Sequence, residues 1–187
     1  MTFTAITGGI GSGKSYVCRL LALRGIAVYD CDQAAKRLIA QDPDLQRTLK
    51  SLVGPTLYAN GTLQKSVLAK FLLQSEANKQ AIDEAVHPAV ARDFQQSGYT
   101  WLESAILFDS GFYRRIHFTN TVGVTAPLEL RVKRIMARDG ITHDKAMEWI
   151  GRQWPQDKVA GLCNFIIVND GKHDLETQIN QLLKIIS

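Results

Sequence analysis

The strongest constraint on this chain is a glycine-rich segment near its beginning. Residues 8–15 read Gly-Gly-Ile-Gly-Ser-Gly-Lys-Ser and match the pattern G-x-x-x-x-G-K-[ST]. β-prone residues 3–7 precede the segment, and a helical pattern over 15–23, closed by Gly25, follows it. A glycine turn that merely precedes Lys-Ser does not explain this order of strand, loop and helix. We therefore interpret the segment as a phosphate-binding P-loop.

Each residue type in the loop has a physical task. Glycines let the backbone curl so that its N–H groups point at phosphates, and the positive end of the helix adds to the attraction. Lys14 is expected to reach the β- and γ-phosphates of ATP, and the Ser15 hydroxyl is expected to ligate Mg²⁺. The predicted nucleotide-binding residues are Gly8, Gly9, Gly11, Ser12, Gly13, Lys14 and Ser15, with Tyr16 beside them on an outward-facing position.

Composition favours one ordered, compact chain with a small-molecule ligand. The 187 residues are 45% hydrophobic and 21% charged, enough for one core and a small helical addition. The net charge of +4 suits an anionic partner, but the basic residues are scattered, and a small phosphorylated ligand explains this charge as well as nucleic acid does. We expect a monomer or weak homo-oligomer.

Cysteine usage and hydropathy predict a cytoplasmic protein. The three cysteines are odd in number, far apart and without CxxC spacing, which argues against a disulfide framework or a zinc site. The N-terminal residues show no charged leader and no cleavage signal, so we expect no export. The longest apolar runs are far shorter than the roughly 20 residues of a membrane span.

The hydrophobic pattern predicts an α/β fold of the P-loop NTPase type. Further strands are expected at 26–29, 100–108, 120–124 and 165–168, and helices at 128–138, 143–152 and 175–185. This alternation predicts a mainly parallel sheet with helices on both faces. Residues 33–98 show helical spacing without a convincing strand and are expected to form an insert. Pro88 is expected to mark a kink or a helix start within 82–94.

Two aspartates follow the second expected strand. Asp30 and Asp32 would lie at the carboxyl end of that strand, where open α/β sheets bind their ligands. A carboxylate there could accept the proton of an acceptor hydroxyl during phosphoryl transfer. Asp32 could equally be the N-cap of a helix beginning near Gln33. Spacing alone leaves the two alternatives open.

Other charged residues are weaker candidates. Glu103 could hold a metal-bound water or simply end a strand. Arg131, Arg134 and Arg138 recur along one helix face. We assign Arg138 to a lid that closes over the triphosphate and Arg131 to a solvated surface. Asn169 could contact the adenine or make the turn that Gly171 completes.

The motifs together resemble dephospho-CoA kinase along nearly the whole chain. The resemblance is carried by the P-loop lettering, Asp30-Cys31-Asp32, His87-Pro88, Leu107-Phe108-Asp109, Arg134, Arg138-Asp139, Gln153 and Asn169-Asp170-Gly171. It implies ATP as donor, the ribose 3′-hydroxyl of dephospho-CoA as acceptor, and Mg²⁺. It also implies a core of residues 1–32 and 99–187, a CoA-binding insert over 33–98 and a lid at about 138–160.

The same resemblance distributes the roles. It implies Asp32 as the base, which joins Lys14 of the P-loop and Arg138 of the lid in the expected catalytic set. The expected acceptor-binding residues are Asp32, Lys65, His87 and Leu107, although a lone histidine before proline, such as His87, is also typical of a structural hydrogen-bonding residue. Lys65 and Asp109 stand where the family usually has arginine and glutamate. Lysine cannot form the bidentate fork of arginine, so a contact from position 65 would differ in detail.

Other functional classes fit less well. A GTP-binding switch needs N-K-x-D and D-x-x-G, and neither is present: Asn78-Lys79-Gln80-Ala81 lacks the aspartate, and Asp109-Ser110-Gly111 is one residue short. A nucleic-acid binder is disfavoured because there is no aromatic and basic platform. A nucleoside or nucleotide kinase remains the alternative that the P-loop alone does not exclude.

Overall fold

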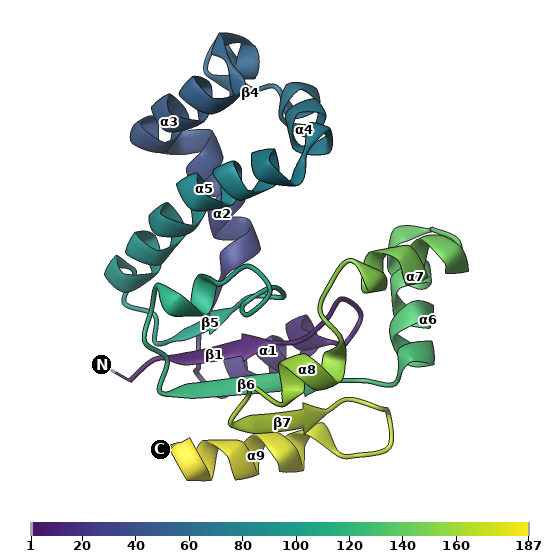
Figure 1. The fold of residues 1–187 in the computed structure, drawn as a ribbon. Coiled ribbons are helices and arrows are strands. Elements are labelled where there is room, and N and C mark those ends of the chain that lie inside the picture. The colour runs from purple at the N-terminus through teal and green to yellow at the C-terminus, as the bar shows by residue number, and fades with distance from the viewer. Residues whose placement is uncertain (1, 187) are drawn as a thin grey trace. The chain divides into compact units, whose positions relative to one another are not determined.

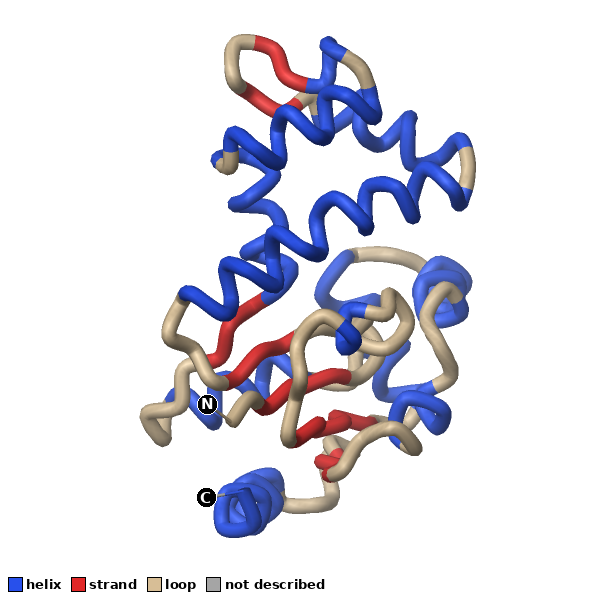
Figure 2. Tube along the Cα trace, turned by 60° about the vertical axis from the view of Figure 1, so that its left-hand side comes forward, coloured by secondary structure: helices blue, strands red, loops and turns tan. Residues whose placement is uncertain are grey.

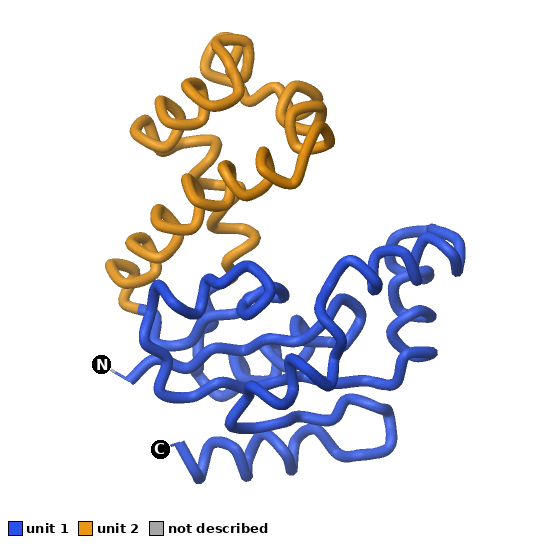
Figure 3. The backbone as a smooth tube through the Cα atoms, in the orientation of Figure 1, with its two compact units in different colours: residues 1–29, 99–187 blue, residues 30–98 orange. Residues whose placement is uncertain are grey.

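The structure is a computed structural model that describes residues 2–186. Its chain forms two compact units, one made of residues 1–29 and 99–187, the other of residues 30–98 (Figure 3). The first unit is discontinuous in sequence, because the second is inserted between its two segments.

A five-stranded sheet forms the centre of the first unit (Figure 1). Its strands are β1 (Thr4–Thr7), β2 (Val28–Asp30), β5 (Trp101–Glu103), β6 (Asn120–Thr125) and β7 (Phe165–Val168), arranged in the order β2-β5-β1-β6-β7. β1 pairs in parallel with β5 and β6, and β6 pairs in parallel with β7. The predicted parallel α/β sheet is confirmed.

Helices cover this sheet on both sides. The helices on the sheet are α1 (Lys14–Ala22), α8 (Gln156–Ala160) and α9 (Leu175–Ile186). Two further helices, α6 (Leu128–Asp139) and α7 (His143–Gly151), pack against each other beside the sheet, and a 3₁₀ turn η2 spans Phe112–Arg114. In Figure 1, α8 lies in front of the sheet and α1 behind it. The main core joins α1 and α9 to the strands through buried residues such as Val17, Leu21, Val122, Ile167 and Ile179.

In the first unit one sequence expectation was wrong and one element was not predicted. The strand expected over 100–108 ends at Glu103, and residues 105–110 form turns. Leu107 and Phe108 are apolar because they are buried in the core, 0% and 6% exposed, and not because they extend a strand. The helix α8 was missed, since five residues are too few to show a helical period.

The second unit is helical except for one short hairpin. Its helices are α2 (Cys31–Gln41), α3 (Pro43–Val53), α4 (Lys65–Gln74) and α5 (Glu76–Gln96), with a 3₁₀ turn η1 at Pro55–Leu57. Strands β3 (Tyr58–Ala59) and β4 (Thr62–Leu63) pair antiparallel, and Figure 2 shows them as the red segments of this unit. The expectation of no strand was therefore wrong.

The turn chemistry accounts for this hairpin. Asn60 and Gly61 both have positive φ, 48° and 76°, which is the backbone that a two-residue hairpin turn requires and that Asn-Gly adopts readily. The hairpin is fixed to α2 because the Tyr58 hydroxyl donates to the Ile39 carbonyl at 2.7 Å. Strands of two residues carry too little alternation to be seen in the sequence.

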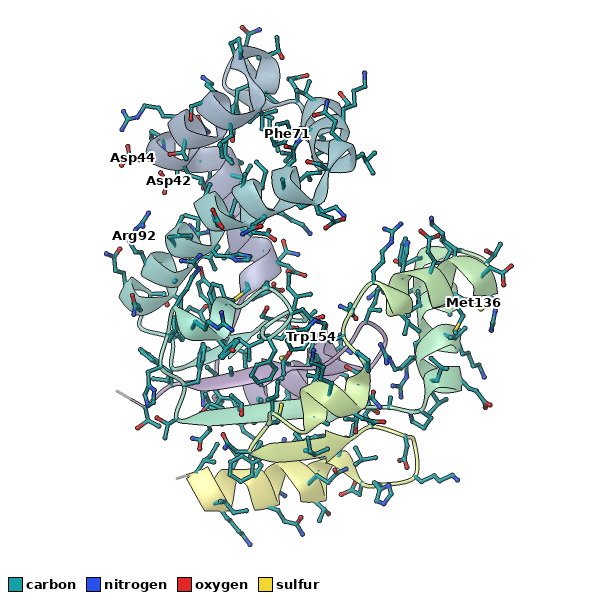
Figure 4. The ribbon with its side chains drawn as sticks, viewed as in Figure 1. Asp42, Asp44, Phe71, Arg92, Met136 and Trp154 are labelled. Atoms are coloured by element: carbon teal, nitrogen blue, oxygen red, sulfur yellow. The ribbon has the colours of Figure 1, made fainter. Side chains whose placement is uncertain are left out.

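Helix boundaries in this unit follow their caps. Asp42, labelled in Figure 4, accepts from the N–H groups of Asp44 and Leu45 and starts α3. Ser75 caps α5 in the same way, by accepting from the N–H of Asn78. The alternative of a helix start at Pro88 is wrong, because α5 continues through this residue, where the proline removes one backbone donor from the ladder.

Candidate active site

The loop between β1 and α1 has a backbone that only glycines can form. Gly8, Gly11 and Gly13 have positive φ values of 143°, 79° and 93°. A Cβ on Gly8 would lie 2.2 Å from the Val124 carbonyl oxygen, and one on Gly13 would lie 2.0 Å from Asn169 Nδ2. Both the conformation and the space therefore demand glycine at these positions.

Lys14 begins α1 and turns inward. It is 8% exposed, and its Nζ lies 3.6 Å from Oε1 of Glu103, at the end of the strand beside β1. This ion pair holds the ammonium group at the carboxyl edge of the sheet. Ser15 and Tyr16 are exposed on the first turn of α1, and Arg19 lies over the Tyr16 ring at 5.4 Å.

Two buried hydroxyls at this edge suit a polar ligand. Thr7 Oγ1, at the end of β1, and Ser12 Oγ, within the loop, are buried and have no hydrogen-bond partner among residues 2–186. An unsatisfied buried hydroxyl costs free energy, and such groups are few in folded proteins. Their place beside the glycine loop fits a site completed by phosphate oxygens and their counter-ion.

Arg134 and Asn169 hold the loop by hydrogen bonds to its backbone carbonyls. Arg134 Nη1 donates to the carbonyls of Gly11 and Ser12, both at 3.3 Å, and its Nη2 donates to the carbonyl and Oδ1 of Asn169, both at 3.1 Å. Asn169 Nδ2 in turn donates to the Ser12 carbonyl at 2.9 Å. The contact of Asn169 with adenine stays a prediction, whereas this supporting role was missed.

Arg131 corrects a sequence interpretation. It was assigned to a solvated surface, but it is 5% exposed and its Nε donates to the Ile10 carbonyl at 2.9 Å. Burial lowers its pKa from the ordinary value. Arg138, the expected lid residue, is exposed, its Nη2 lies 2.7 Å from Oδ2 of the neighbouring Asp139, and its role in a lid stays a prediction. Helical spacing cannot tell these positions apart, because only packing decides which turn of α6 meets the loop.

The segment between α7 and α8 contacts two loops of the first unit. Gln153 Oε1 accepts from the Ile10 N–H at 2.7 Å. The next residue, Trp154, labelled in Figure 4, donates its backbone N–H to Asp109 Oδ2 at 2.7 Å. Asp109 thus anchors a loop, a role that its resemblance to a family glutamate did not predict. Leu107, an expected acceptor contact, is fully buried.

The remaining candidates belong to the second unit. Asp30 is the N-cap of α2, since its Oδ1 accepts from the Gln33 N–H at 2.9 Å. Asp32, which the sequence favoured equally as a cap, lies exposed in the first turn of α2. Lys65 is exposed at the start of α4. His87 lies within α5, with its Nε2 3.7 Å from Asp83 Oδ1.

Two kinds of feature are absent from the described residues, a cluster of acidic, histidine or cysteine side chains and a membrane-spanning helix. Within 2–186 there is no group of three or more His, Cys, Asp or Glu side chains that could hold a metal ion. Over the same range, no helix is long and apolar enough to cross a membrane.

These features define the class. A P-loop at the carboxyl edge of a parallel sheet, with a buried lysine at the start of the following helix, is the nucleotide site of a P-loop NTPase-type protein.

The comparisons with known proteins then give the family. The family model for dephospho-CoA kinase matches residues 2–174. A dephospho-CoA kinase from Bacteroides fragilis is 37% identical over 97% of this chain and 91% of its own length. The chain therefore belongs to the dephospho-CoA kinase family, a family of transferases for which ATP is a substrate.

Solved structures agree in fold. A Thermus thermophilus protein, 30% identical, superposes with a TM-score of 0.83 over 100% of this chain and 98% of its own. The dephospho-CoA kinase from Campylobacter jejuni gives 0.66 at 18% identity, over 98% of this chain and 96% of its own, which bears on the fold alone.

Proposed function

We propose that this chain transfers the γ-phosphoryl group of ATP to the ribose 3′-hydroxyl of dephospho-CoA, giving coenzyme A. The observation that carries the proposal is the match of residues 2–174 to the dephospho-CoA kinase family, on a chain whose P-loop has the required backbone. The proposal includes a cytoplasmic enzyme, monomeric or weakly self-associating, that binds neither nucleic acid nor membrane.

The nucleotide end of the reaction belongs to the P-loop. Its N–H groups and the start of α1 are suited to the β- and γ-phosphates, and Lys14 supplies a charge to the oxygens of the transferring group. Ser15 is exposed at the start of α1 and would hold Mg²⁺ by its hydroxyl. The bound ion would neutralise charge on the phosphates. The unsatisfied hydroxyls of Thr7 and Ser12 support a polar ligand at this place.

The acceptor end is assigned to the 30–98 unit and to Asp32. Asp30 Oδ1 accepts the Gln33 N–H as the cap of α2, and we assign the exposed carboxylate of Asp32 to accept the proton of the 3′-hydroxyl. His87 and Lys65 are proposed as contacts to the acceptor, whereas Leu107 is fully buried and is not proposed as one. Arg138 is proposed to leave Asp139 and stabilise the transferring phosphoryl group when ATP binds.

An acceptor panel tests the proposal. The enzyme is given ATP and Mg²⁺ with dephospho-CoA, adenosine, cytidine or AMP, and ADP release is followed. Of the four acceptors, we expect only dephospho-CoA to support turnover. Mass spectrometry and phosphorus NMR should then show that the product carries the new phosphate at the 3′ position. Turnover only with a nucleoside or nucleotide would overturn the acceptor assignment.

A further inference from the structure

We propose that Arg131 and Gln153 are positioning residues that clamp the two polar backbone groups of Ile10, and thereby hold the P-loop in its phosphate-binding shape. The inference rests on the proposed nucleotide site. It concerns residues that do not belong to the P-loop itself.

Both hydrogen bonds end on one residue. The Ile10 carbonyl accepts from Arg131 Nε at 2.9 Å, and the Ile10 N–H donates to Gln153 Oε1 at 2.7 Å. Arg131 lies in the first half of α6, and Gln153 follows the end of α7. The segment that contains α6 and α7 therefore contacts Ile10 through a residue near each of the segment's two ends. One residue of the loop is thus fixed in orientation by two side chains that are distant from it in sequence.

The side chain of Ile10 is held by the same helices. It packs against the small hydrophobic cluster formed by Val132, Ile135 and Ala146 of α6 and α7. Met136, labelled in Figure 4, and Trp149 belong to the same cluster. Backbone and side chain of Ile10 therefore both depend on the α6–α7 segment, and the loop cannot change shape there without disturbing it.

Gly9 gives independent support. Its φ is not among the positive values of the chain, so the backbone conformation does not demand glycine. A Cβ on Gly9 would lie 2.3 Å from Arg131 Nη2 and 3.3 Å from Gln153 Oε1. The space that glycine leaves is filled by the Arg131 guanidinium. A Cβ on Gly11 would likewise meet the Arg131 backbone, 2.7 Å from its carbonyl oxygen.

The burial of Arg131 fits a positioning role. A guanidinium at 5% exposure loses hydration, and within 2–186 no carboxylate forms an ion pair with it. That loss is offset only by directed hydrogen bonds and packing. In addition, Gln153 occupies the Ile10 N–H, so phosphate would be bound by the later N–H groups of the loop. The directions in which these later N–H groups point depend on the orientation of Ile10, which the hydrogen bonds with Arg131 and Gln153 fix.

The test is ADP binding by calorimetry to Arg131→Met, Gln153→Met and the double variant, with Lys133→Met as control. Lys133 is an exposed cation on the same helix. We expect each single variant to weaken ADP binding about tenfold, the loss of one strong hydrogen bond. The affinity of the double variant for ADP should fall by much less than the product of the two single-variant factors, because both hydrogen bonds orient the same residue. The control should match the wild type.

A second pair of measurements separates the clamp from general stability. The Ile10 amide, followed by NMR hydrogen exchange, should lose protection in Gln153→Met while melting temperatures stay similar. Gly9→Ala, introduced into the wild-type chain, should weaken ADP binding strongly. The same change introduced into Arg131→Ala should weaken ADP binding only slightly, because the guanidinium that would clash with the new Cβ is then absent. Unchanged ADP affinity in the single variants, or fully multiplicative losses, would overturn the clamp.

These results also distinguish the two proposals. A wild type that does not bind ADP would refute the proposed function, while exchange of the Ile10 amide would still report on the clamp. If the Arg131 variants do not fold, the ADP affinity and the Ile10 amide exchange of Gln153→Met decide the question.

Discussion

At the scale of single residues, neighbours of the same type have separate tasks. Asp30 and Asp32 are two positions apart, yet the first is used by the Gln33 N–H and the second is exposed within the helix. Arg131 and Arg138 lie on one helix, yet one is buried against the P-loop and the other is paired with its neighbour. Local geometry, and not residue type, assigns each role.

Asp32→Asn tests the proposed base. The change keeps shape and removes the charge and the proton acceptor, so single-turnover transfer should fall at least about 100-fold, the usual scale of lost general-base catalysis. ATP affinity should change little. Asp30→Asn is a matched control, because asparagine caps helices as well as aspartate does. Loss of transfer in the control with a normal Asp32→Asn rate would move the base to Asp30.

At the scale of elements, the turn between β7 and α9 depends on one carboxylate. Asp170 Oδ1 accepts from the backbone N–H groups of His173 and Lys172, at 3.0 and 2.9 Å, and Oδ2 lies 2.9 Å from His173 Nδ1. These hydrogen bonds, the one from the His173 backbone first, hold the pKa of Asp170 well below its ordinary value. The turn begins at Asn169, which contacts the P-loop.

This depressed pKa predicts a pH dependence. The stabilising contribution of Asp170 is fully present above the unfolded pKa of about 4 and is lost as the pH falls further, because protonation removes the acceptor. Asp170→Ala should therefore lower the urea midpoint of unfolding at pH 7. The difference in urea midpoint between this variant and the wild type should be smaller at pH 3. Asp170→Asn, which keeps one acceptor oxygen but cannot ionise, should lie between them at pH 7. A gap independent of pH would contradict the assignment.

At the scale of the whole molecule, the chain leaves and re-enters one sheet. β1 precedes the 30–98 unit and β5 follows it, and the two pair in parallel with Ile6 opposite Glu103. That pairing brings Lys14 within reach of Glu103, although almost ninety residues separate them. The inserted unit has its own buried residues, among them Leu45, Leu49 and Phe94.

Hydrogen exchange tests the proposal that residues 30–98 bind dephospho-CoA and that the other unit binds the nucleotide. Dephospho-CoA alone should slow exchange within residues 30–98, because ordering a binding element raises its local opening free energy. ADP alone should protect the loop at 8–15 and the α6–α7 segment. Protection by dephospho-CoA confined to the P-loop would contradict assignment of the acceptor to the inserted unit.

The sequence by itself determined the local features. The P-loop follows from residue spacing, because its glycines, lysine and serine must occur in that order to adopt the loop backbone. Strands such as 165–168 and helices such as 128–138 follow from hydrophobic period, and the structure places them at Phe165–Val168 and Leu128–Asp139. The resemblance of the motifs to dephospho-CoA kinase rests on the same kind of local pattern, and the comparisons confirm the family.

Only the tertiary structure decided which side chains meet. Arg131, Arg134 and Arg138 have equivalent helical spacing, and packing of α6 against the loop alone buries the first and exposes the last. Gln153 reaches Ile10 across 143 positions, a contact that no local period encodes. The cap of α2 is Asp30 and not Asp32, because the helix begins where β2 ends, and the sheet fixes that point. Local patterns depend on neighbours in sequence, whereas these contacts depend on the three-dimensional packing of distant segments.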